Sequence, residues 1–206
     1  MTSKKKKLGI LLSGRGSNFL AIADSIEAGR IPNAEIAIVI SNKEDAPGLA
    51  AAKKRGLDAL LIASKGKTRE QHDAEMIQAL KEKGVDLICL AGYMRLLSPE
   101  FIRAFPHKIL NIHPSLLPAF AGLEAQKQAL DYGVKISGCT VHFVDEALDH
   151  GPIILQKSVP VLADDDEHSL SLRILKEEHV AYSEGIAIVL GGKVEITGRT
   201  VNTKRK

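Results

Sequence analysis

The chain has 206 residues, of which 45% are hydrophobic and 26% charged, and this composition is typical of a soluble globular protein and too apolar for a disordered one. We therefore predict one domain over residues 1–206, with flexible tails at 1–7 and 199–206. The formal net charge of +3 depends on seven basic residues near the two ends. Without them, 21 basic and 25 acidic residues remain, which disfavours a nucleic-acid-binding groove.

The apolar segments are short, and none approaches the ~18 residues needed to cross a bilayer. The start of the chain also lacks the long apolar region of a signal peptide. We therefore expect a cytoplasmic protein without a membrane partner. The two cysteines, Cys89 and Cys139, lie in apolar runs without metal-ligand spacing, which predicts free buried thiols.

The first half of the chain alternates short apolar runs with segments of helical periodicity. This pattern predicts parallel strands joined by crossover helices. The expected strands cover residues 8–12, 34–40, 57–62, 85–91 and 108–112. Helix starts are expected at Asn18, at Pro47, at the capping-box pair Thr68 and Gln71, and at Ser98 with Pro99.

The second half predicts longer strands with a different pairing. A helix near 126–130 precedes two strand-like runs at 136–144 and 152–161, which are close enough in sequence to pair with antiparallel or mixed geometry. A long helix at 169–190 ends at two glycines, and a last strand is expected at 193–197. The fold class is therefore α/β: an open, Rossmann-like sheet, mostly parallel and becoming mixed in the C-terminal half, with helices on both faces.

A glycine-rich loop, "SGRGSN" at 13–18, follows the first predicted strand and opens the first helix. Its backbone amides and the helix N-terminus favour an anion. Phe19 stands where a dinucleotide fingerprint needs its third glycine, and the Gly-Lys-Ser/Thr end of a P-loop is missing. A single phosphate held by Gly16, Ser17 and Asn18 fits better than NAD or a nucleoside triphosphate, although a purely structural turn is the alternative.

A polar pair, Asn111 and His113, ends the fifth predicted strand. The i, i+2 spacing in an extended chain directs both side chains to one face, at the strand end where open α/β sheets bind ligands. An amide beside an imidazole can stabilise an oxyanion while the imidazole moves a proton. Asp149, in a loop between two strands, could orient His113. The alternative is a hydrogen-bonded core histidine with a capping asparagine; the other histidines show no metal spacing, so no metal is expected.

Five motifs in order resemble the phosphoribosylglycinamide formyltransferases, a branch of the folate-dependent formyltransferases. They are "GRGSN", "AGYMRLLSP", "ILNIHPSLLP", "GCTVHFVDEALDHGPII" and "EEHVAY", and the resemblance runs from Leu8 to about Thr197. It implies transfer of a formyl group from 10-formyltetrahydrofolate to the glycine amine of 5-phosphoribosylglycinamide, in de novo purine biosynthesis. Both substrates are small molecules, and the resemblance leaves a monomer or a homodimer open.

The resemblance also implies a role for each matching residue. Asn111, His113 and Asp149 would be catalytic. Gly16, Ser17 and Asn18 would hold the substrate phosphate, and Glu178 the ribonucleotide end. The folate would be bound by Arg69, Met94, Arg95, Leu96, Leu97 and Asn111, with Asp145, Glu146, Ala147 and Leu148 in the loop over the pterin.

Three alternatives to this function remain. A formyltetrahydrofolate hydrolase shares the catalytic trio but usually carries a regulatory domain before the first strand. A methionyl-tRNA formyltransferase would need a basic domain after the catalytic one. A non-catalytic nucleotide-binding module would use the glycine loop but would leave Asn111, His113 and Asp149 without a purpose.

Overall fold

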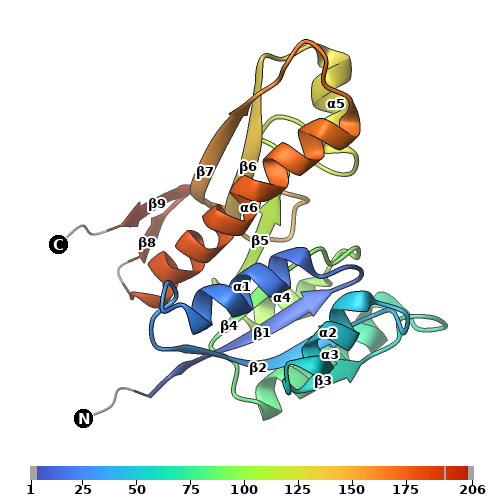
Figure 1. Ribbon diagram of the computed structural model, residues 1–206. Coiled ribbons are helices and arrows are strands. Elements are labelled where there is room, and N and C mark those ends of the chain that lie inside the picture. The colour runs from blue at the N-terminus through green and yellow to red at the C-terminus, as the bar shows by residue number, and fades with distance from the viewer. Residues whose placement is uncertain (1–3, 193, 204–206) are drawn as a thin grey trace. The chain divides into compact units, whose positions relative to one another are not determined.

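The computed structural model describes residues 4–192 and 194–203 and divides into two compact units, Met1–Leu110 and Asn111–Lys206. Each unit is an α/β arrangement with its own buried residues (Figure 1). Within the described ranges, none of the helices combines the length and apolar character that crossing a membrane requires.

The first unit contains a parallel sheet, as the alternating pattern predicts. Its strands are β1 (Lys6–Leu12), β2 (Ala34–Ser41), β3 (Ala59–Leu61) and β4 (Leu87–Leu90), in the order β3-β2-β1-β4. The pairings β1 with β2, β1 with β4 and β2 with β3 are all parallel. Leu8, Ile10, Leu11 and Leu12 are completely buried, because a parallel sheet is covered on both faces.

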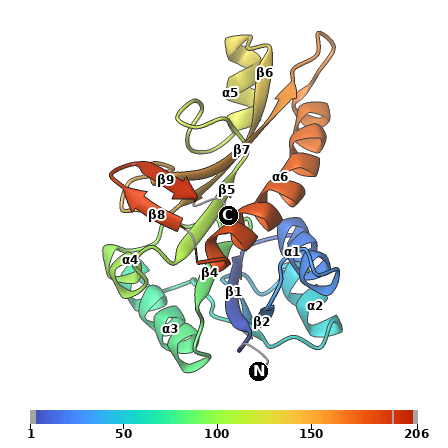
Figure 2. The same cartoon turned by 90° about the vertical axis from the view of Figure 1, so that its left-hand side faces the viewer.

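Four helices cover this sheet. They are α1 (Ser17–Glu27), α2 (Pro47–Lys54), α3 (Arg69–Glu82) and α4 (Pro99–Ala104). Figure 2 shows α1 and α2 on one side of β1 and β4, and α3 and α4 on the other. The predicted start signals are confirmed for the last three: Pro47 begins α2, Thr68 and Gln71 form a capping box, and Ser98 caps α4. The first helix begins one residue before the predicted Asn18.

The second unit is mixed, which confirms the predicted change in the C-terminal half. Strand β5 (Ile109–His113) leads into it, and the strand order is β5-β6-β7-β9-β8. Strands β6 (Ile136–Phe143) and β7 (Ile153–Pro160) are antiparallel, β9 (Thr200–Thr203) is parallel to β7, and β8 (Val194–Thr197) is antiparallel to β9. The helices are α5 (Ala125–Tyr132) and α6 (Glu167–Leu190).

Helix α6 lies along β6 and β7 (Figure 1), and a glycine allows its close approach. A Cβ atom on Gly185 would lie 2.7 Å from Cγ1 of Val141 on β6, which is shorter than any real contact of that kind. The helix ends at Gly191 and at Gly192 with φ 70°, as the two glycines predict.

Strands occupy part of both predicted tails. Lys6 and Lys7 belong to β1, and β9 occupies 200–203 inside the predicted tail 199–206. The sequence Thr-Val-Asn-Thr is too polar to predict a strand by itself, and its pairing with β8 stabilises it. Residues 1–3 and 204–206, and Lys193 at the start of the predicted last strand, lie outside the described residues.

The glycine loop after β1 packs backbone against backbone on the start of α2. The N–H of Gly48 donates to the carbonyl of Gly14 at 3.0 Å, and Gly16 has φ 76°, which favours glycine. A Cβ on Gly48 would lie 3.1 Å from Cα of Gly16, 3.0 Å from the Gly14 oxygen and 2.8 Å from Cδ2 of Leu12. Gly48 therefore lets α2 support the loop directly.

Substituting Gly48→Ala should lower the free energy of unfolding by about 1–3 kcal/mol, because the added methyl group has no space beside backbone atoms. Urea denaturation of the purified variant measures this loss. Gly14→Ala is the matched control, since a Cβ there meets nothing within 4 Å. If both variants unfold at the wild-type urea concentration, the loop is not constrained by this contact.

Candidate active site

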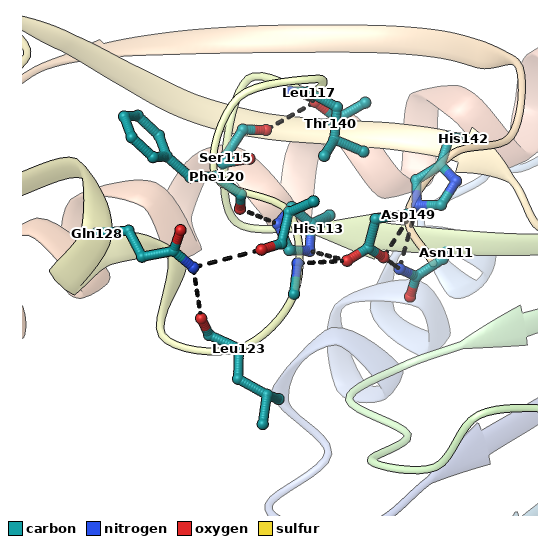
Figure 3. Close-up of polar contacts among 12 residues, drawn as sticks. Asn111, His113, Ser115, Leu117, Phe120, Leu123, Gln128, Thr140, His142 and Asp149 are labelled. Carbon is teal, nitrogen blue, oxygen red and sulfur yellow. Dashed lines mark hydrogen bonds and ion pairs between the residues drawn. The ribbon is translucent and has the colours of Figure 1, made fainter. Parts of the chain in front are cut away.

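The second unit brings the three predicted catalytic side chains together. Asn111 and His113 are the third and fifth residues of β5, and Asp149 lies in the loop between β6 and β7. Nδ1 of His113 is 3.3 Å from Oδ2 of Asp149, and Nδ2 of Asn111 is 3.5 Å from its Oδ1 (Figure 3). The same-face geometry of the i, i+2 pair therefore holds, and the carboxylate lies against both side chains.

His113 lies between two hydrogen-bond acceptors. Its Nδ1 faces the Asp149 carboxylate, and its Nε2 is 2.9 Å from the carbonyl oxygen of Phe120. Only the imidazolium carries a proton on both ring nitrogens, so only the charged ring donates to both partners at once. The side chain is only 6% exposed, and burial strengthens polar contacts of this kind electrostatically.

Asp149 is fixed by its backbone as well as by its partners. It has φ 48°, and its Oδ2 accepts a hydrogen bond from the N–H of Gly122 at 2.9 Å. The loop returns toward β7 through Gly151, where a Cβ would lie 1.8 Å from the carbonyl oxygen of Phe143. Only glycine permits this close approach, so Gly151 helps to set the position of the carboxylate.

A fourth polar residue, His142 on β6, joins the cluster and was not predicted as part of it. Its Nδ1 is 2.8 Å from the carbonyl oxygen of Phe143, so the ring proton lies there and Nε2 accepts. Nδ2 of Asn111 is 3.2 Å from this Nε2. The sequence signal for it is an imidazole inside an apolar strand, which the spacing of the histidines alone does not reveal.

The turn after β5 is held by two polar side chains. Thr140 Oγ1 donates to the carbonyl of Ser115 at 2.7 Å and accepts from the N–H of Leu117 at 3.0 Å. Nε2 of Gln156 donates to the Leu117 carbonyl at 2.9 Å and to Thr140 at 3.0 Å. The contact between Ser115, Leu117 and Thr140 is visible above His113 in Figure 3. These bonds fix the exit of the chain from the strand that carries Asn111 and His113.

The predicted loop over the pterin, 145–148, is stabilised from within. Oδ1 of Asp145 accepts from the N–H of Ala147 at 3.0 Å, and Oδ2 is 2.9 Å from Nδ1 of His150. Leu148 and Glu146 are exposed. The Asp145 carboxylate therefore stabilises the loop to which it belongs, while the apolar Leu148 side chain faces solvent. Glu178 lies on the buried side of α6, which is unusual for a carboxylate.

The predicted phosphate residues lie at the start of α1 in the first unit. Gly16 precedes the helix, Ser17 and Asn18 form its first turn, and that turn holds no acidic side chain and no side-chain cap. Its backbone amides therefore favour an anion.

Ser13 supports this loop and was not predicted to do so. Its hydroxyl donates to Oδ1 of Asn42 at 2.7 Å and accepts from the N–H of Met94 at 2.8 Å.

This serine connects the glycine loop with the predicted folate-binding segment, 94–97. Met94 and Leu96 are exposed, Leu97 is buried, and the Nε atom of Arg95 is buried without a hydrogen-bond partner. Arg69 is the first residue of α3 and is exposed. Apolar side chains facing solvent beside an arginine suit a ligand with both an aromatic and an acidic part. Among the described residues, no group of three or more His, Cys, Asp or Glu is arranged to hold a metal ion.

Comparison with known proteins identifies the family. Residues 6–186 match the model described as formyl transferase. The chain belongs to the formyl transferase family. This confirms the resemblance that the sequence motifs indicate, and the match extends across both compact units.

Individual members of the formyl transferase family are similar over almost the whole chain. Phosphoribosylglycinamide formyltransferase of Escherichia coli is 42% identical over 91% of this chain and 88% of its own length. The trifunctional purine biosynthetic protein adenosine-3 of Drosophila melanogaster is 47% identical over 96% of this chain, which spans only 15% of that relative. The crystal structure of glycinamide ribonucleotide transformylase 1 from Symbiobacterium toebii is 50% identical, with a TM-score of 0.95 over 98% of this chain and 95% of that one.

The protonation of His142 predicts a pH dependence of stability in this formyl transferase. Burial lowers the pKa of His142 below its ordinary value of 6.5, against smaller opposing effects of the Phe143 carbonyl and Asp149. The unfolded chain therefore binds the proton more readily than the folded one. The part of the unfolding free energy that depends on a neutral His142 ring is fully present above about pH 6.5. It is lost as the pH falls toward the lowered pKa of the folded chain.

Urea unfolding of the wild type and of His142→Gln between about pH 7 and pH 5 tests this dependence. The wild type should lose more unfolding free energy on acidification than the variant, which has no titrating ring. His168→Gln, at an exposed histidine in the first turn of α6, is the control and should follow the wild type. Parallel curves for all three proteins would mean that the folded chain does not keep His142 neutral.

Proposed function

We propose that this chain transfers a formyl group from 10-formyltetrahydrofolate to the glycine amine of 5-phosphoribosylglycinamide in de novo purine biosynthesis. The products are the N-formyl amide and tetrahydrofolate. The observation that carries the proposal is His113, held between the Asp149 carboxylate and the Phe120 carbonyl with the Asn111 amide beside it. Family membership and the names of the similar proteins support this reaction and these substrates.

The chemistry begins when the neutral amine attacks the formyl carbon and a tetrahedral intermediate forms with a negative oxygen. The amide nitrogen Nδ2 of Asn111 is 3.2 Å from Nε2 of His142, and its contact with Oδ1 of Asp149 is longer, at 3.5 Å, so its second N–H is held less closely. In the proposed mechanism, this second N–H donates to the oxyanion. A preorganised donor of this kind stabilises the developing charge without reorganisation.

His113 supplies the second donor. Since Asp149 already lies at Nδ1, the Nε2–H is the group that reaches the oxyanion. To do so, Nε2–H leaves the Phe120 carbonyl and donates to the formyl oxygen instead. Asp149 keeps the ring charged and oriented. It also helps to move the proton from the attacking nitrogen to the leaving nitrogen of the folate through water, so that the carbon–nitrogen bond to the folate breaks as the new amide is completed.

The substrate-binding residues are part of the same proposal. Gly16, Ser17 and Asn18 hold the phosphate with the uncapped start of α1, and Glu178 binds the ribonucleotide end. The folate-binding set is Arg69, Met94, Arg95, Leu96, Leu97, Asn111, Asp145, Glu146, Ala147 and Leu148. The exposed Met94, Leu96 and Leu148 side chains support this assignment. The family match across both units supports one formyltransferase domain.

An absorbance assay for deformylated folate tests the proposed function. The purified chain is mixed with 10-formyltetrahydrofolate, with and without 5-phosphoribosylglycinamide. Folate release that depends on the ribonucleotide is the expected result. Release at the same rate without the ribonucleotide would mean hydrolysis, and no release under either condition would favour a binding module.

Replacing the proposed oxyanion donor tests the mechanism. Asn111→Ala should lower turnover by about 10²–10³-fold, the usual loss for such a donor, while the circular dichroism spectrum stays unchanged. Asn202→Ala, at an exposed asparagine of β9, is the matched control and should keep wild-type turnover. Near-normal turnover of Asn111→Ala would remove Asn111 from the mechanism.

A further inference from the structure

The loop between β5 and α5 touches both members of the His113–Asp149 pair with backbone atoms. The Phe120 carbonyl faces Nε2 of His113 at 2.9 Å, and the N–H of Gly122 faces Oδ2 of Asp149 at 2.9 Å. These two groups lie two residues apart on one short stretch of chain. A shift of this stretch would therefore move a partner of the imidazole and a partner of the carboxylate together.

This stretch has an unfavourable backbone conformation. Phe120 has φ 54°, Gly122 has φ 85° and Glu124 has φ 56°, all in the left-handed region. Non-glycine residues adopt this region only when surrounding contacts hold them there. The structure must therefore contain groups that fix residues 120–124 against their own conformational preference.

Gln128 on α5 supplies such a contact. Its Nε2 donates to the carbonyl of Leu123 at 2.7 Å and to the carbonyl of Ala121 at 3.3 Å (Figure 3). These carbonyls belong to the residues on either side of Gly122. One carboxamide with two N–H groups thus holds the chain immediately before and after the N–H that contacts Asp149. The Ala119 carbonyl is held separately by the Ser115 hydroxyl at 2.5 Å.

We propose that Gln128 is a positioning residue for formyl transfer: it holds residues 121–123 so that the Gly122 N–H and the Phe120 carbonyl align Asp149 and His113. The proposal rests on the proposed function of His113 and Asp149. Gln128 itself is exposed and contacts neither side chain, so it acts only through the backbone of the loop.

The sharpest variant is Gln128→Glu, which keeps the size of the side chain but replaces the NH2 group with a carboxylate oxygen that repels the two carbonyls. Gln128→Ala removes the contact without repulsion. Gln126→Ala is the matched control, because Gln126 lies on the same helix and its side chain makes no hydrogen bond to any described residue. All three substitutions leave the buried residues of α5 unchanged, and circular dichroism and thermal melting check the fold.

Two measurements test the role. The first is formyl transfer: Gln128→Glu should lower kcat by about 10–100-fold, the loss expected for a small misplacement of catalytic groups, with KM for each substrate changed less than about twofold. Gln128→Ala should show a smaller loss in the same direction. Gln126→Ala should match the wild type.

The second measurement is the nitrogen NMR spectrum of histidine-labelled protein, with the His113 ring signals assigned from a His113→Gln variant. Gln128→Glu should shift the Nδ1 and Nε2 signals of His113, whereas Gln126→Ala should not. This readout needs no substrate, so it separates a failure of this proposal from a failure of the proposed function.

Unchanged His113 signals in Gln128→Glu would overturn the proposal, whether or not the wild type transfers formyl groups. A kcat at or above the wild-type value in both Gln128 variants would also overturn it. A lowered melting temperature with normal kcat and unchanged ring signals would show that Gln128 only stabilises the helix, which contradicts a positioning role.

Discussion

The Asp149 carboxylate joins three separate stretches of the second unit. Its Oδ2 lies 3.3 Å from Nδ1 of His113 at the end of β5 and accepts from the N–H of Gly122 after that strand, while its own loop comes from the β6–β7 connection. The side chain is only 10% exposed, and a charge with so little water around it requires such partners. Removing one partner of a buried ion pair typically costs about 3–5 kcal/mol. Loss of one of these partners would therefore destabilise this unit.

The two histidines of the cluster are near the same carboxylate but have opposite hydrogen-bonding environments. His113 faces an acceptor at each ring nitrogen. His142 faces the Phe143 carbonyl at one nitrogen and the Asn111 amide donor at the other, an arrangement that the neutral ring satisfies. Burial acts in the same direction by lowering the pKa of His142. The partners of each ring therefore decide which of its nitrogens can donate a hydrogen bond and which can accept one.

Sequence reasoning predicted the elements that depend on local signals. Hydrophobic runs located the strands of the first unit, and Thr68, Ser98 and Pro47 located helix starts, because caps and prolines act within one turn. The pairing of Asn111 with His113 followed from the two-residue period of a strand. Strand β9 was missed because its stability comes from pairing with β8 and not from apolar residues.

The supporting contacts of the site could not be predicted in the same way. The Phe120 carbonyl and the Gly122 N–H are backbone groups that every residue type offers, so the sequence contains no sign of their use. Ser13 and Gln128 are polar side chains of a kind found on any surface, and their roles depend on the fold around them. Predicting these roles needs the path of the loop and not its residue types.

The use of backbone groups by the loop after β5 has a consequence for sequence variation. Because the groups that face His113 and Asp149 belong to the main chain, side chains at Ala121 and Leu123 are free to drift without altering the chemical groups presented to the cluster. On the proposed role of Gln128, selection would act on what sets the path of the chain, such as the glycine at 122 and the carboxamide at 128. In a set of diverged descendants, positions 121 and 123 would show high substitution rates. Positions 122 and 128 would be nearly invariant, although neither residue contacts the reacting atoms.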